Sequence, residues 1–188
     1  MIGALVAGIT GSGGASLSSY ESIATYTGSG NPTFIEFTSI PSTFKHLQIR
    51  TMARDIFGGS GTDNFNLRFN SDTASNYAIH RLQGDGASAT ASGTASTTSV
   101  SIIPSTILDG STANIFAVSI IDILDYGSTS KNKTVRYLSG GDLNGSGRVS
   151  VGSGLWMSTS AVTTIRLTTG GTGYSTPSSF ALYGIKEA

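Results

Sequence analysis

The chain has 188 residues, enough for one domain with a substantial hydrophobic core. Gly, Ser and Thr make up 79 of the residues and only 12% are charged, a composition that favours strands and turns over long helices. Eleven basic residues balance eleven acidic ones without a basic run along the chain, so we expect neither a nucleic-acid nor a membrane partner, and the lack of cysteine excludes disulfides and thiolate metal sites.

The first segment of the chain, residues 1–31, is predicted to be an extended arm. It starts with a short apolar run and continues into Gly- and Ser-rich sequence, which favours extended backbone. No basic residue precedes the run and it is too short to span a bilayer, so a secretory signal fits poorly. An idle tail would more often be polar, and we interpret the run as an arm that docks on a partner. Its docking residues are Ile2, Leu5, Val6 and Ile9.

The remaining residues, 32–188, are predicted to form one domain of strands. Ten short runs are separated by turn-forming residues, and no amphipathic helix interrupts them. The alternation is clearest where Phe65, Leu67 and Phe69 alternate with polar residues. The runs lie at 33–40, 46–55, 64–70, 76–83, 98–104, 114–124, 133–140, 148–157, 163–170 and 178–185. This pattern predicts an all-β fold, an antiparallel β-sandwich of jelly-roll-like type with an extended N-terminal arm.

Two low-complexity segments, residues 84–96 and 170–178, are predicted to be exposed loops because neither has enough apolar surface to join a core. The predicted core consists of large apolar residues in strand-like runs. They are Ile49, Phe65, Leu67, Phe69, Phe116, Val118, Ile120, Ile165, Leu167, Phe180 and Leu182.

Residues that carry chemistry are scarce in this sequence. Catalytic triads rely largely on His and Cys, and the two histidines, His46 and His80, are interpreted as structural or surface residues. Residues 142–147 match the first ligand positions of a calcium loop, but position twelve is Ser153 in place of Glu, so an ordinary turn is favoured. We expect no catalytic, cofactor-binding or metal-binding residue, and no enzymatic activity.

Aromatic residues offer one further possibility, because exposed rings bind sugars and partner proteins alike. Packing in a core or an interface is nevertheless the favoured role for them. They include Tyr20, Tyr26, Tyr77, Tyr126, Tyr137, Trp156, Tyr174 and Tyr183.

Several longer stretches resemble a family of virion structural proteins of tailed bacteriophages. The resemblance extends from Ser19 to Lys186, and members of the family are described as head decoration (cement), tail-fibre or minor structural proteins. The stretches are FIEFTSIPSTFKHLQIRTMARD, FNLRFNSDTASNYAIHRLQGDG, ILDYGSTSKNKTVRYLSGGDLNGSG, GSGLWMSTSAVTTIRLT and SSFALYGIK. The resemblance implies a jelly-roll-like sandwich, assembly as a homotrimer and a structural or adhesive role, and it implies no catalytic residue.

The sequence therefore predicts a capsid decoration protein, a homotrimer on the outer surface of the phage capsid. Its N-terminal arm is expected to clamp neighbouring major capsid proteins, and no cofactor is expected. The chain has no heptad repeat or fibre repeat that would build a long shaft. The alternative is a tail-fibre or receptor-binding protein that recognises host surface polysaccharide through Tyr and Trp rings and the two exposed loops. A glycan hydrolase is a third possibility.

Overall fold

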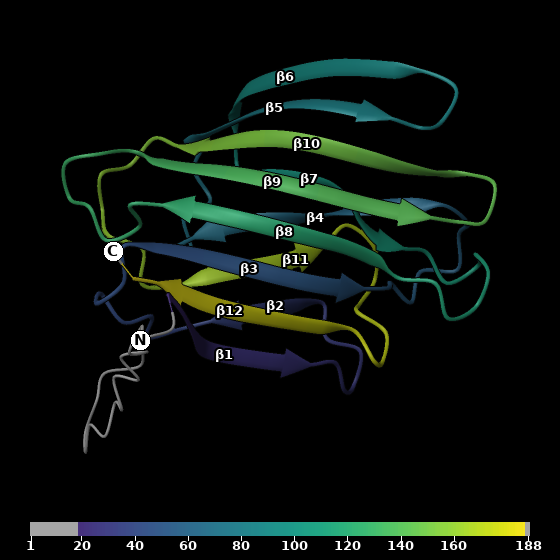
Figure 1. Cartoon of the computed structure of the whole chain (residues 1–188), viewed down its shortest axis with the longest axis horizontal. Helices are drawn as coiled ribbons and strands as arrows, with labels where there is room; N and C mark the ends of the chain where they lie inside the picture. Colours follow the sequence, from purple (N-terminus) through teal and green to yellow (C-terminus); the bar gives the residue numbers. More distant parts are fainter. Residues whose placement is uncertain (1–18, 187–188) are drawn as a thin grey trace, which may run out of the picture.

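The computed structural model describes residues 19–186, which form two antiparallel sheets packed face to face (Figure 1). The strands of the larger sheet, in spatial order, are β1 (Tyr20–Thr27), β12 (Ser179–Ile185), β3 (His46–Ala53), β8 (Ala117–Leu124), β9 (Lys133–Asp142), β10 (Gly147–Trp156), β5 (Tyr77–Gly84) and β6 (Ala89–Thr97). Those of the smaller sheet are β2 (Phe34–Phe37), β11 (Ile165–Thr169), β4 (Thr62–Phe69) and β7 (Val100–Ile107). The predicted all-β antiparallel sandwich is confirmed, whereas its jelly-roll connectivity stays a prediction.

The hydrophobic core fills the space between the two sheets. In β4 the alternation predicted from the sequence holds, because Phe65, Leu67 and Phe69 are all fully buried. Ile165 and Leu167 of β11 pair with Phe69 and Leu67 in the same sheet. Each of these side chains stabilises the fold by about 1.5 to 3 kcal/mol through removal of apolar surface from water.

Strand β8 contradicts part of the predicted core. Val118 and Ile120 point outward and are exposed, and Phe116, just before the strand, is only half-buried. Ile121 and Ile123 face the core instead, and both are fully buried. The prediction therefore placed the wrong face of β8 against the core. Side chains in a strand alternate between two faces, so an error of one residue exchanges the buried set and the exposed set.

Both predicted loops also differ from expectation. Most of the 84–96 segment belongs to β6, an edge strand paired with β5, and eight of the nine β6 residues are exposed. The 170–178 segment does connect two strands, but Tyr174 within it is fully buried and its hydroxyl donates a hydrogen bond to the Leu167 carbonyl at 3.2 Å. Thus one segment is a strand and the other contributes to the core.

The predicted boundary between arm and domain, at residue 31, also needs revision. Tyr20–Thr27 forms β1 and pairs with β12 at one edge of the larger sheet, so part of the predicted arm belongs to the sandwich. The Lys186 backbone N–H donates to the Ser19 carbonyl at 3.0 Å, which places these two residues side by side. The docking residues Ile2, Leu5, Val6 and Ile9 lie outside the described residues. Within 19–186, no helix is long and apolar enough to cross a membrane.

Candidate functional site

The two histidines lie far apart in the sheet order and do not form a common site. His46 is on β3 and His80 on β5, with three strands between them. The Asp125 backbone N–H donates to His46 Nδ1 at 3.0 Å, while the His80 ring packs over Gly93 on β6. Among residues 19–186 there is no group of three or more His, Asp or Glu side chains placed to hold a metal ion.

The calcium-like segment forms the turn between β9 and β10. The Asn144 backbone N–H donates to Asp142 Oδ1 at 2.8 Å, and the Leu143 N–H donates to the Ser146 carbonyl at 2.8 Å. These bonds are those of a turn in which an aspartate accepts from the backbone two residues later. The segment therefore forms a turn between the two strands, at the place where the sequence predicts one.

Most of the aromatic residues pack in the core. Trp156 is buried, stacks on Tyr77, and donates from its indole Nε1 to Asp72 Oδ2 at 2.7 Å. Tyr126, Tyr137 and Tyr174 are also buried. Tyr20 and Tyr183 differ, since Arg50 lies over both rings, with its Cζ 5.9 Å and 5.5 Å from the ring centroids. The rings proposed for sugar stacking are thus largely unavailable for that role.

The outer face of the larger sheet carries a continuous strip of exposed aliphatic side chains, which we call the apolar band. Its members come from five neighbouring strands and are each between 40% and 55% exposed. They are Met52, Leu82, Val118, Ile120, Leu138, Val149 and Val151. A large contiguous apolar patch on a folded surface marks a site of interaction, whereas single exposed apolar residues do not.

Strand register places the apolar band in two adjacent rows that run across the strands. In one row Ile120 of β8 pairs with Leu138 of β9, which pairs with Val151 of β10, and Leu82 of β5 completes the row. In the next row Met52 pairs with Val118 and, through Gly140, the row reaches Val149. Because residues of one strand alternate between faces, these positions all point away from the core.

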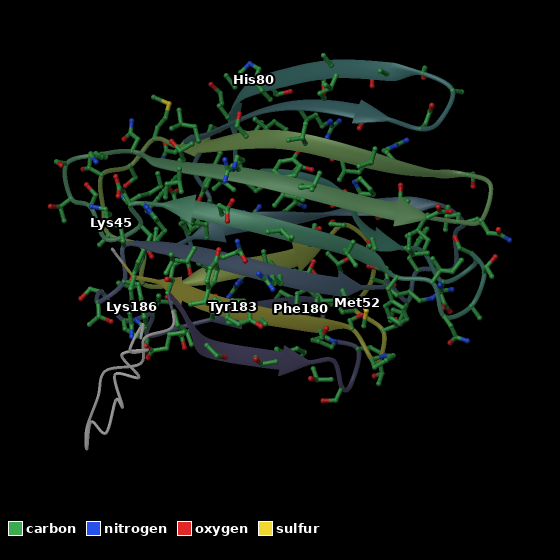
Figure 2. The ribbon with its side chains drawn as sticks, viewed as in Figure 1. Lys45, Met52, His80, Phe180, Tyr183 and Lys186 are labelled. Carbon is green, nitrogen blue, oxygen red and sulfur yellow. The ribbon has the colours of Figure 1, made fainter. Side chains whose placement is uncertain are left out.

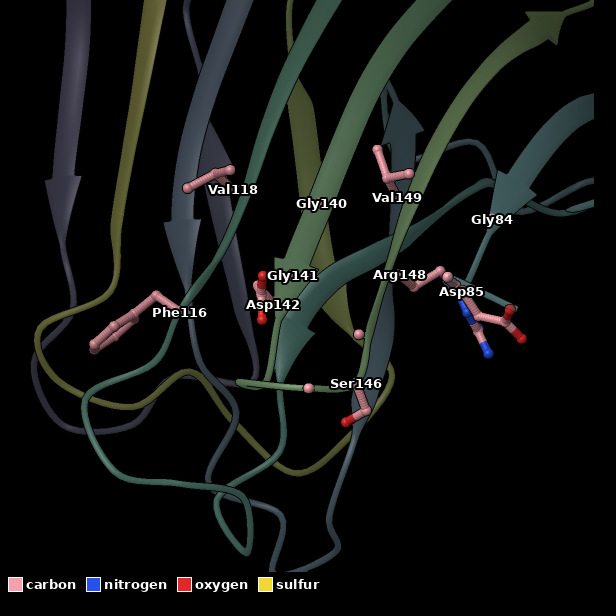
Figure 3. Close-up of a pocket in the computed structure, with 13 residues that line it drawn as sticks. Gly84, Asp85, Phe116, Val118, Gly140, Gly141, Asp142, Ser146, Arg148 and Val149 are labelled. Carbon is pink, nitrogen blue, oxygen red and sulfur yellow. The ribbon is translucent and has the colours of Figure 1, made fainter. Parts of the chain in front are cut away.

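The second row is hollowed where glycine replaces a larger side chain. Figure 3 shows Gly140 on β9 between Val118 on β8 and Val149 on β10. Together with the β9–β10 turn and Gly84, these residues line an open hollow of about 600 Å³. The outer face is therefore indented at the end of the sheet where β9 ends and β10 begins, and the charged residues Asp85, Asp142 and Arg148 also line this hollow.

A row of polar side chains borders the apolar band next to the row of Ile120 and Leu138. Gln48 Nε2 donates to Asp122 Oδ1 at 2.9 Å, and Arg136 Nη2 donates to Asp122 Oδ2, also at 2.9 Å. Arg50 Nε donates to Gln48 Oε1 at 2.9 Å. The side chains next to the apolar band are thus held in place by one another, and the border carries both positive and negative charge. An apolar centre with a polar, hydrogen-bonded rim is the usual composition of a protein–protein interface.

The buried charged groups hold loops in place. The Arg54 guanidinium donates to the carbonyls of Asp109, Ser111, Thr112 and Ile115, and its Nε donates to the Asp109 carboxylate at 3.1 Å. These bonds fix the segment between β7 and β8 against the end of β3. Five guanidinium donors are thereby satisfied inside the protein, as burial of an arginine requires.

The structure therefore defines a class of protein, a β-sandwich whose larger sheet exposes an apolar, interface-like outer face. In comparisons with known proteins, no family model matches the chain and no curated protein sequence matches it. Sequence reasoning missed the apolar band because it placed Val118 and Ile120 in the core. A signal that could have found it is Asp122, a charged residue that shares a strand face with Val118 and Ile120 and so favours that face as the outer one.

Proposed function

We propose that the chain is a non-enzymatic structural subunit of a bacteriophage virion, a capsid decoration protein that works as a homotrimer on the outside of the head. The observation that carries this proposal is the apolar band, which gives the subunit a surface for permanent contact. The resemblance of residues 19–186 to phage virion proteins supports the proposed place of the chain in a virion. The proposed action is the burial of surface between subunits, with no chemical step.

The occupant we assign to the apolar band is a second copy of the same chain. The seven residues of the apolar band are each 40% to 55% exposed, and they lie next to one another across five strands, as the contiguous apolar patches at interaction sites do. A stable interface buries roughly 800 Å² per partner, and the polar rim of Gln48, Asp122 and Arg136 adjoins the apolar band and would be buried with it. The net charge of zero means that copies do not repel one another as they approach.

Contact between the subunits would also strengthen attachment to the capsid. Residues 1–18, with the docking residues Ile2, Leu5, Val6 and Ile9, are proposed to bind neighbouring major capsid proteins. Three arms tethered to one trimer act at high effective concentration, so their joint affinity can exceed that of one arm by about 10² to 10⁴. A trimer seated across several capsid proteins would then resist their separation.

The tail-fibre alternative receives less support from the structure. It relied on Tyr and Trp rings for polysaccharide binding, and Trp156 and most of the tyrosines are buried in the core. It also relied on two exposed loops, of which the first is largely strand β6. The apolar band is better suited to another protein surface than to a hydroxyl-rich glycan.

The self-association is tested with two substitutions on the same face of β9. Leu138→Asp places a charge in the centre of the apolar band, whereas Thr134→Asp places the same charge on an exposed residue four positions away, outside the band. We expect sedimentation analysis to show a trimer for the wild type and for Thr134→Asp, and a folded monomer for Leu138→Asp. A wild-type protein that stays monomeric at high micromolar concentration would refute the assignment of this face.

The place in the virion requires a separate experiment. Cryo-electron microscopy of intact virions is expected to show many copies of the sandwich on the head. Deletion of residues 2–10 is expected to leave a folded trimer that no longer decorates heads. A few copies at the tail tip would instead establish the receptor-binding alternative.

A further inference from the structure

A second hollow lies at the opposite end of the sandwich, where β3 begins and the loop after β8 leads to β9. It has a volume of about 340 Å³, and we call it the lysine hollow. The lining residues that matter here are Phe44, Lys45, Asp125, Ser128, Ser130 and Lys131. Figure 2 shows Lys45 and Met52 at opposite ends of β3, so this hollow is remote from the glycine-lined one. The polar row of Gln48, Asp122 and Arg136 separates it from the apolar band.

The chain has only four lysines, and two of them, Lys45 and Lys131, line this hollow. Lys131 Nζ donates to Asp125 Oδ2 at 2.6 Å, and Lys45 Nζ lies 3.7 Å from Asp125 Oδ1. An ammonium group has three N–H donors, and the bond from Lys131 to Asp125 uses one of them. The hydrogen bond from Lys131 also lowers the pKa of Asp125, so this carboxylate stays ionised and able to accept hydrogen bonds at neutral pH. The hollow therefore presents both cationic donors and a fixed acceptor.

A third lysine fixes the loop that carries these groups. Lys133 is fully buried, and its Nζ donates to the carbonyls of Ser128 and Lys131, both at 2.7 Å. Burial lowers the pKa of Lys133, and these two carbonyls compensate for part of its lost hydration. The Ser130 backbone N–H also donates to Ser128 Oγ at 3.2 Å. These hydrogen bonds tie the loop to side chains of its own strand and turn, which favours a preorganised binding site.

Phe44 adds an apolar wall to this polar hollow. A side chain at Gly184 would overlap the Phe44 ring, so the ring rests directly on the backbone of β12. The same side chain lines the hollow and is only partly buried. An aromatic wall beside hydroxyls, an acceptor carboxylate and ammonium groups matches the surface of a sugar, which has an apolar C–H face and a hydroxyl rim. A bare inorganic anion would make no use of the ring.

We propose that the lysine hollow binds an acidic sugar unit of a polysaccharide, of the hexuronic acid class. The sugar carboxylate contacts the ammonium groups of Lys131 and Lys45, its hydroxyls bond with Asp125 and the two serines, and its ring lies on Phe44. This inference does not rest on the self-association proposed above, because the hollow and the apolar band are separate surfaces. It adds a glycan contact to a subunit whose main role is structural.

The test is calorimetric titration of the full chain with trigalacturonate, with neutral maltotriose and inorganic phosphate as comparison ligands. We expect trigalacturonate to bind at least about tenfold more tightly than maltotriose, since a charge-assisted hydrogen bond supplies that much discrimination. Lys131→Gln and Phe44→Leu are each expected to weaken trigalacturonate binding by about tenfold. Thermal melting of each variant verifies that it is folded.

The matched control is Lys186→Gln, which removes a lysine at the same end of the sandwich. Lys186 pairs with Glu21 at 2.9 Å and does not line the hollow, so binding of trigalacturonate should change by less than about twofold. Equal affinity for maltotriose, or an equal loss of affinity in Lys186→Gln and Lys131→Gln, would overturn the site. Phosphate binding as tight as that of trigalacturonate, together with unchanged affinity in Phe44→Leu, would overturn the sugar as its ligand.

Discussion

Two neighbouring isoleucines in β8 provide a direct test of how this strand is placed. Ile121 is fully buried between the sheets, while Ile120 points outward and is 43% exposed. The substitutions Ile121→Ala and Ile120→Ala remove the same atoms from adjacent positions. Their effects on stability therefore differ only through the environment of each side chain.

The expected difference follows from burial. Removing three buried carbon groups from Ile121 loses about 2.4 kcal/mol of transfer free energy, at about 0.8 kcal/mol each. The cavity left between the sheets raises the total to about 3 or 4 kcal/mol. Ile120 already exposes much of its surface to water, so its truncation should destabilise the monomer by only about 1 kcal/mol.

The assay is urea unfolding at concentrations low enough to keep the wild type monomeric, so that association does not add to the measured stability. In thermal unfolding the same values correspond to a decrease of roughly 10 °C for Ile121→Ala and a few degrees for Ile120→Ala. Equal destabilisation by the two substitutions, or a larger effect at Ile120, would refute the register of β8 and with it the apolar band.

Three further predictions concern single side chains. Arg54→Met should lower the free energy of unfolding by at least about 3 kcal/mol in urea, because several loop carbonyls lose their hydrogen-bond donor. The control Arg136→Met removes an exposed arginine and should lower the free energy of unfolding by under about 1 kcal/mol. Hydrogen bonds from Asn76 and Trp156 lower the pKa of Asp72, so its ionised form stabilises the fold above about pH 4, and this contribution is lost as the pH falls through the lowered pKa. Asp72→Asn should therefore be less stable at pH 7 but lose less stability between about pH 4 and pH 2, and an unchanged acid-unfolding curve would contradict this. Gly152→Ala would place Cβ 2.6 Å from Tyr137 Cε1 and should lower stability by about 1 to 3 kcal/mol, while Gly127→Ala, with no atom within 4 Å, should be close to neutral in thermal melting.

The sandwich was predictable because its strands alternate and its turns are marked by Gly, Pro, Asn and Ser. Strand β4 is the clearest case, since its large residues all occur at alternate positions. Strand β8 was harder because apolar residues occupy both of its faces. The inward-facing Ala117 and Ser119 are small, and the outward-facing Val118 and Ile120 are larger, so size favoured the wrong face. Asp122 on the outward face indicates the opposite, and the pairing with β3 and β9 fixes that face as the outer one.

Strand β6 illustrates a second limit of sequence reasoning. Its residues are Ala, Thr, Ser and Gly, and eight of the nine are exposed, so no pattern of burial distinguishes it from a loop. It becomes a strand because β5 supplies a partner for its backbone. The lysine hollow was likewise hidden, since Lys45 and Lys131 are distant in the sequence and meet only after β3 and β8 pair.

The hydrogen bond between Lys186 and Ser19 has a practical consequence for engineering. Because these residues are adjacent, the sandwich could be inserted into a surface loop of another protein with little separation between the points of entry and exit. A short linker between them would equally allow a circular permutant that opens at Gly86, in the exposed turn between β5 and β6. Cargo fused at the new ends would then be displayed at the far end of the sandwich from the original ones.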